Sequence, residues 1–184
     1  MSMFWLWLTL TRIEDGLPWW LRFDYSLSEK WKVRVGLLSL GAFVSIFAGT
    51  FVSTTPGANY GCGVDGSPYA WPLCNGKIVD SVQNVVAQSQ MIHRWFVGLM
   101  LIALIYASYS ISKEQTWNNG LRNWIWGSTF LFLANTSIGA IYVLSWDLEE
   151  GFFEYLSLLH LMMASLTFVT LAISWIGCSI AEDG

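Results

Sequence analysis

The sequence predicts an all-α integral membrane protein, a four-transmembrane-helix up-down bundle. Apolar residues make up 54% of the chain and charged residues only 12%. The charges separate apolar runs of roughly twenty residues, the length that crosses a hydrocarbon core. The expected spans, with ends uncertain by about 2–4 residues, are Val33–Ser53, Val86–Ile111, Asn123–Leu144 and Phe152–Ile176. They form one expected domain, 33–177, between an N-terminal arm, 1–32, and a short polar tail, 178–184.

Basic residues predict the orientation of the bundle. Lysine and arginine are concentrated before the first span and between the second and third, whereas Lys77 lies in a loop of the opposite side. Because basic residues favour the inner side, we expect both termini on the cytoplasmic or matrix side and the long loop, about 54–85, outside. The membrane would be a bacterial or archaeal cytoplasmic membrane or an organelle inner membrane. Basic residues this few and dispersed do not indicate a nucleic-acid surface.

The N-terminal arm is apolar and aromatic. Met1–Leu10 is too short to span a bilayer and lacks the basic start of a signal peptide. With Leu17–Leu21 it forms a segment that either lies in the membrane interface or docks on a neighbouring subunit.

The long outer loop contains Cys62 and Cys74 and is rich in glycine, proline, asparagine and serine. On the oxidising side a disulfide between these cysteines would contribute about 3 kcal/mol. A metal site or a redox-active pair is the alternative, but neither matches the spacing, which is not C-x-x-C. Cys178 reads as a small buried apolar residue.

The two histidines of the chain, His93 and His160, each lie about eight residues into a different apolar run. Their spans enter the membrane from the same side, so both imidazoles should lie roughly 12 Å below the outer boundary. Ionisable groups at such depth indicate function. A helical-bundle core with two imidazoles suits haem iron, and the alternative is a pair of polar groups that hold helices together.

Residues near the histidines extend this prediction. Gln90 shares a helix face with His93, and Arg94 is expected to pair with a haem propionate or with lipid headgroups. Gly98 and Ala164 are small enough to leave room for a flat macrocycle. Three methionines are weaker alternatives as iron ligands because of their directions on the helices: Met91, Met162 and Met163.

Several segments together resemble haem A synthases. They are Gly49-Thr50-Phe51-Val52, Cys62 followed by Trp71-Pro72-Leu73-Cys74-Asn75-Gly76, Gln90-x-x-His93-Arg94, and Leu159-His160-Leu161. The resemblance covers roughly Gly36 to Ile176. Members of that family usually have two four-helix halves, each with a histidine pair, one half holding a b-type haem and the other receiving haem O. This chain resembles a single half, the compact half-length form.

The resemblance implies roles for particular residues. His93 and His160 match the histidine pair of one half, and Cys62 and Cys74 match the cysteine pair of the substrate-side half. That half carries a glutamate three residues before its first histidine, implicated in oxidising the haem methyl group. The residue here is Gln90, which cannot act as a carboxylate base. Ser53 also stands where the family usually has a basic residue.

These observations favour a b-type haem protein that serves as an electron-transfer or structural subunit of a larger respiratory or other membrane complex, or pairs with itself as a homo-oligomer. The cofactor would be haem b, bound by His93, His160, Gln90 and Arg94. One alternative is haem A synthase itself, which converts haem O to haem A for cytochrome oxidase. The other is a haem-free structural subunit of the bilayer.

Overall fold

Four long helices form the molecule, which we describe from a computed structural model covering residues 18–79, 85–114, 118–146 and 152–181 and four single positions nearer the N-terminus. The helices are α2 (Tyr25–Thr54), α3 (Val85–Ile111), α4 (Gly120–Leu144) and α6 (Glu154–Ile180). Each is long and apolar enough to cross a membrane. The predicted fold class is therefore confirmed.

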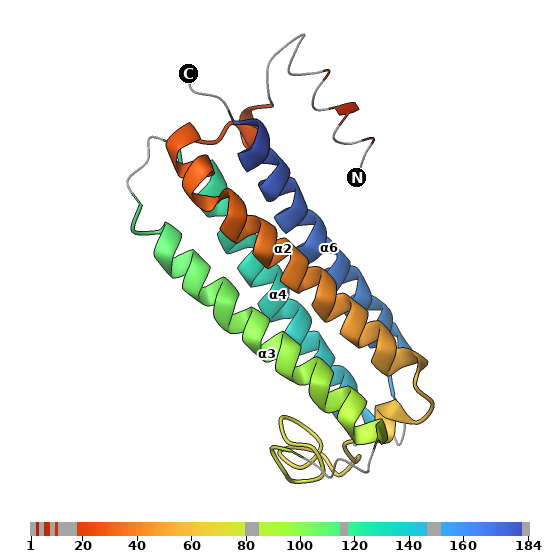
Figure 1. Cartoon of the computed structure of the whole chain (residues 1–184). Coiled ribbons are helices and arrows are strands. Elements are labelled where there is room, and N and C mark those ends of the chain that lie inside the picture. Colours follow the sequence, from red (N-terminus) through yellow and green to blue (C-terminus); the bar gives the residue numbers. More distant parts are fainter. Residues whose placement is uncertain are drawn as a thin grey trace.

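The helices run side by side in alternating directions (Figure 1). The start of α2 and the end of α6 lie at one end of the bundle, here called the terminal end. The segment between α2 and α3 lies at the opposite end, here called the loop end. Which membrane face each end meets stays a prediction from the basic residues.

The helices extend beyond the predicted spans. α2 begins at Tyr25 rather than Val33, because the Asp24 carboxylate accepts a hydrogen bond from the backbone N–H of Leu27 at 3.0 Å and caps the helix. Residues 25–32, assigned to the arm from sequence, are therefore helical. α6 continues to Ile180 rather than ending at Ile176, so part of the predicted tail is helical as well.

Large apolar side chains fill the core toward the terminal end. Those that are fully buried include Leu21, Trp31, Val35, Leu104, Ile111, Leu121, Ile125 and Leu171. Hydroxyl groups also join the helices: Ser108 Oγ lies 2.8 Å from Thr129 Oγ1, and Ser128 donates to Thr170 Oγ1 at 2.9 Å. Such bonds between small side chains hold membrane helices together.

The second part of the aromatic arm packs on the chain's own bundle. Leu21 and Phe23 are buried, and Trp124 on α4 donates through Nε1 to the carbonyl of Trp20 at 3.0 Å. Trp19 is exposed. From the sequence we expected the arm to lie in the membrane interface or on a neighbouring subunit. Its docking on the chain's own bundle was not predicted. Most of Met1–Leu10 lies outside the described residues.

Candidate functional site

The two histidines face one another inside the bundle. His93 on α3 and His160 on α6 have ring centroids 6.4 Å apart, with ring planes at 85°. The two rings therefore lie at the same level of the bundle. Two imidazoles on opposite sides of one metal ion would have centroids about 6 Å apart, because a metal–imidazole nitrogen bond is about 2 Å long. The observed separation fits a single iron between them.

Each imidazole rests on a glycine of the neighbouring helix. A Cβ atom at Gly49 on α2 would lie 3.1 Å from Cε1 of His93. A Cβ atom at Gly139 on α4 would lie 2.8 Å from Cε1 of His160. A side chain at Gly139 would force the His160 ring to move, and one at Gly49 would press the His93 ring by a few tenths of an ångström. These two glycines therefore form seats for the histidines.

A backbone carbonyl orients the His160 ring. His160 Nδ1 lies 2.9 Å from the carbonyl oxygen of Asn135, four residues before the glycine seat. With the proton on Nδ1, this bond leaves Nε2 as the free electron-pair donor, the usual arrangement of a metal-binding histidine. The Asn135 side-chain oxygen is buried and lacks a hydrogen-bond partner. The α4–α6 pair thus presents a histidine prepared for coordination.

The α2–α3 pair repeats this arrangement around His93. Ser45 lies four residues before the Gly49 seat, and its backbone is beside the His93 ring. His93 Nδ1 is buried, and no hydrogen bond of ordinary geometry joins it to a partner. The two helix pairs are thus built alike, but only His160 has the hydrogen bond at Nδ1 that orients a metal-binding ring.

His93 and His160 are the metal-ligating side chains that the described residues bring together here. Within the described residues, no group of three or more histidine, cysteine, aspartate or glutamate side chains could hold a metal ion. A bare transition-metal ion generally takes about four protein or solvent ligands. Haem iron needs only axial ligands from the protein, because the macrocycle supplies the others. The residues present therefore fit a haem better than a free ion.

Gln90 and Arg94 tie the long loop to α3. Arg94 Nη1 donates to the carbonyls of Ala70 at 3.0 Å and Leu73 at 2.7 Å. Its Nη2 donates to Gln90 Oε1 at 2.7 Å. Gln90 in turn donates through Nε2 to the carbonyl of Ala58. Sequence reasoning assigned Arg94 to propionates or lipid headgroups and did not foresee these intramolecular contacts.

The disulfide between Cys62 and Cys74 is present, with an S–S distance of 2.01 Å. Both cysteines are buried in a small cluster with Ala87 and Met91 of α3. The bond therefore packs against the helix turn that precedes His93. Met91, one of the weaker candidate ligands, thus packs against the disulfide.

The Asn-Gly pair after Cys74 forms a tight turn. Asn75 and Gly76 have φ values of 52° and 72°, the left-handed conformation that a two-residue hairpin turn requires. Cys74 and Lys77 exchange backbone hydrogen bonds of 2.8 and 3.0 Å across it. Asn75 Nδ2 also donates to the Gly61 carbonyl at 3.1 Å. The most specific part of the sequence resemblance is thus a structural element of the loop.

Aromatic side chains join the loop to the ends of α4 and α6. Tyr60, in the short helix η2 (Ala58–Tyr60), contacts Trp146 and Phe152 with ring centroids 5.0 and 5.3 Å apart. Phe152 also contacts Tyr142 at 5.3 Å. This aromatic cluster covers the loop end of the bundle, the end nearer to the histidines. It was not predicted from sequence.

Three further residues singled out from the sequence can be placed in the structure. Met162 is exposed, and no heavy atom lies within 4 Å of a Cβ added at Gly98. Cys178 is buried, as predicted. Sequence reasoning missed Gly139, although a glycine inside a helix costs about 1 kcal/mol relative to alanine and so indicates a packing requirement.

The fold and the site define a class: a four-helix membrane bundle with two facing histidines toward one end. The chain is similar to a curated protein called Heme A synthase from an Exiguobacterium species, with 27% identity over 131 residues. The aligned part covers 71% of this chain and 38% of that protein. No protein-family model and no solved structure matches the chain. The similarity supports a haem A synthase-like relationship, over well under half of the relative's length.

Proposed function

We propose that this chain is a haem-binding membrane protein of the haem A synthase type, in which His93 and His160 would hold the haem iron. The observation that carries the proposal is the pair of facing imidazoles, 6.4 Å apart, each seated on a helix glycine. The bound haem would supply a reversible one-electron change at its iron.

The chain's own residues would prepare this site. The Asn135 carbonyl holds the His160 ring by a hydrogen bond at 2.9 Å, which fixes the tautomer and raises the basicity of Nε2. The disulfide and the Arg94 bonds hold the loop over the bundle. Together with the aromatic cluster, the loop would restrict water at that end, and water access is one of the factors that set a haem potential.

Electron transfer is the function that Gln90 favours. Its amide donates to Ala58 and accepts from Arg94, so both polar atoms are used in holding the loop. Gln90 is buried, and an amide neither takes nor gives a proton near neutral pH. We therefore infer a haem b protein that passes electrons, as a subunit of a larger membrane complex or of a homo-oligomer.

Conversion of haem O to haem A is the second candidate function. It is favoured by the similarity, over 71% of this chain, to a protein called Heme A synthase. That reaction oxidises a methyl substituent of the haem, and the resemblance places a carboxylate where this chain has Gln90. In this case a second subunit would supply the carboxylate.

The decisive experiment is purification in mild detergent, with a reduced-minus-oxidised spectrum and mass identification of the extracted haem. We expect haem b, and we expect His93→Ala and His160→Ala each to lose or strongly weaken its binding. Met162→Ala, two residues from His160 and exposed, is the matched control and should bind haem normally. A folded, haem-free preparation would refute the proposal and leave a structural subunit.

Co-expression with a source of haem O separates the two functions. Haem A in the purified protein would establish the synthase function. A preparation loaded with haem b, and without haem A, would support electron transfer.

A further inference from the structure

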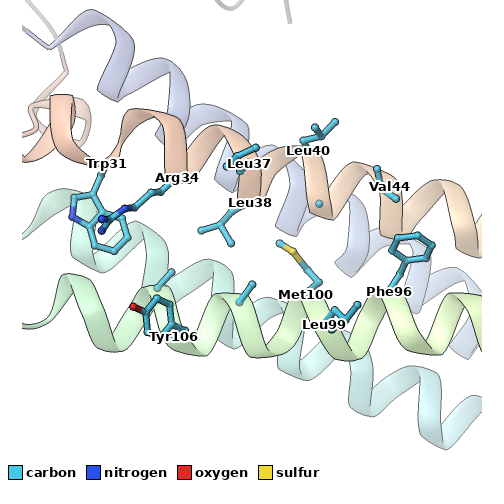
Figure 2. Close-up of a pocket in the computed structure, with 13 residues that line it drawn as sticks. Trp31, Arg34, Leu37, Leu38, Leu40, Val44, Phe96, Leu99, Met100 and Tyr106 are labelled. Atoms are coloured by element: carbon cyan, nitrogen blue, oxygen red, sulfur yellow. The ribbon is translucent and has the colours of Figure 1, made fainter.

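An open groove of about 640 Å³, here called the cavity, lies between α2 and α3, on the part of the bundle nearer the terminal end. Figure 2 shows its lining residues along the two helices. Most of its walls are apolar, and they include Leu38, Leu99 and Met100. Arg34 and Tyr106 lie together at one end (Figure 2), and Val44 and Phe96 lie at the other. The cavity is therefore apolar along its length and polar at one end.

The polar end lies at the edge of the membrane. After Arg34, the rest of α2, residues 35–54, contains no charged residue. Those residues span about 30 Å at 1.5 Å each, which matches the hydrocarbon thickness of a bilayer. Arg34 therefore stands at the level of the lipid headgroups, in the leaflet at the terminal end.

The cavity has the length of one leaflet. Along α2 its lining runs from Trp31 to Val44, and the part that follows Arg34 rises about 15 Å. This is about half of a hydrocarbon core roughly 30 Å thick. A molecule with its head at Arg34 and its tail along the cavity would thus occupy a single leaflet.

The charge of Arg34 has no carboxylate partner in the described part of the chain. The ion pairs there join Lys30 to Glu114 and Lys32 to Glu29. The Arg34 guanidinium instead lies over the Trp31 ring, 5.0 Å from its centroid. Trp31 is 1% exposed, and its Nε1 is buried without a hydrogen-bond acceptor. One cation and one unused donor are thus present at the same end.

We propose that this cavity binds an anionic phospholipid of the leaflet at the terminal end. The phosphate would pair with Arg34, and one acyl chain would lie between α2 and α3. A single positive charge at headgroup level above an apolar channel one leaflet long is the complement of such a lipid. This proposal is independent of haem binding, because the cavity lining does not include either histidine.

The test is a lipid titration of the full-length protein in detergent, followed by native mass spectrometry. Phosphatidylglycerol and phosphatidylcholine with identical acyl chains are the probes. We expect phosphatidylglycerol to bind more tightly, and Arg34→Gln to weaken its binding about fivefold, the effect of one basic residue at a membrane surface. Arg122→Gln, which removes an arginine of α4 outside the cavity, should leave this binding unchanged.

A second pair of variants tests the channel itself. Ala103→Phe would fill the cavity and should lower the binding of both lipids. Ile102→Phe, at the adjacent exposed position outside the lining, should not. His93→Ala should retain lipid binding whether or not haem is bound.

Equal affinity of the two lipids for the unaltered protein would overturn the proposal. So would unchanged phosphatidylglycerol binding in Arg34→Gln. If Ala103→Phe lowered the uptake of haem O but left lipid binding unchanged, the cavity would hold an isoprenoid tail and the lipid assignment would be wrong.

Discussion

Replacing Gly139 by alanine should lower the affinity for haem and leave the stability of the fold nearly unchanged. The added Cβ would lie 2.8 Å from Cε1 and 3.0 Å from Nδ1 of His160, whereas ordinary contacts begin at 3.4 Å. The ring must retreat by more than half an ångström, which disturbs its hydrogen bond to the Asn135 carbonyl. The lost bond costs about 1 kcal/mol. The gain in helix propensity from glycine to alanine is of similar size, about 1 kcal/mol.

The free energy of unfolding of Gly139→Ala should therefore change little, while its haem affinity falls. Loss of the group that orients a metal-binding histidine typically lowers metal affinity about 10- to 100-fold. The assay is a haem titration of the apoprotein in detergent, followed by the Soret absorbance, with thermal unfolding measured in parallel. Gly127→Ala, on the same helix with no heavy atom within 4 Å of the added Cβ, should keep full haem affinity. Equal haem affinity in both variants would refute the claim that Gly139 positions the His160 ring.

Three further predictions concern the loop. The double variant Cys62→Ser, Cys74→Ser should lower the stability of the loop end by about 3 kcal/mol, seen as faster proteolysis; an unchanged cleavage rate would contradict this. Arg94→Met removes donors to two loop carbonyls and to Gln90, and should cost about 2 kcal/mol or more, measured as faster hydrogen exchange in residues 58–79. Gln90→Glu leaves the Ala58 carbonyl without its donor, because an ionised carboxylate donates no hydrogen bond. Exchange in η2 should then accelerate, and unaltered exchange would show that the bond contributes nothing.

The helices and the depth of the histidines could be predicted because both depend on distance along the chain. Apolar run length gives the spans, and the rise per residue places His93 and His160 at one level. The extra turns of α2 could not be inferred from hydropathy, because residues 25–32 are partly polar. Their helical state depends on the Asp24 cap.

The seats of the histidines could not be predicted from the sequence alone. Whether Gly49 and Gly139 meet an imidazole depends on the rotation of one helix against its neighbour, which the pattern of one helix does not fix. The role of Arg94 was missed for a related reason. Its acceptors are carbonyls of Ala70 and Leu73, and the path of an irregular loop cannot be derived from residue preferences.

The position of the seats has a consequence for how the bundle is assembled. His93 and Gly49 belong to the α2–α3 hairpin, whereas His160, Gly139 and Asn135 belong to the α4–α6 hairpin. Each hairpin thus contributes one histidine together with the glycine on which that histidine rests. A cofactor that binds only the joined hairpins stabilises their association by mass action. Haem bound by both hairpins would then stabilise their association. Two fragments divided between residues 114 and 118 should therefore associate when haem is supplied and dissociate in the bilayer when it is withheld.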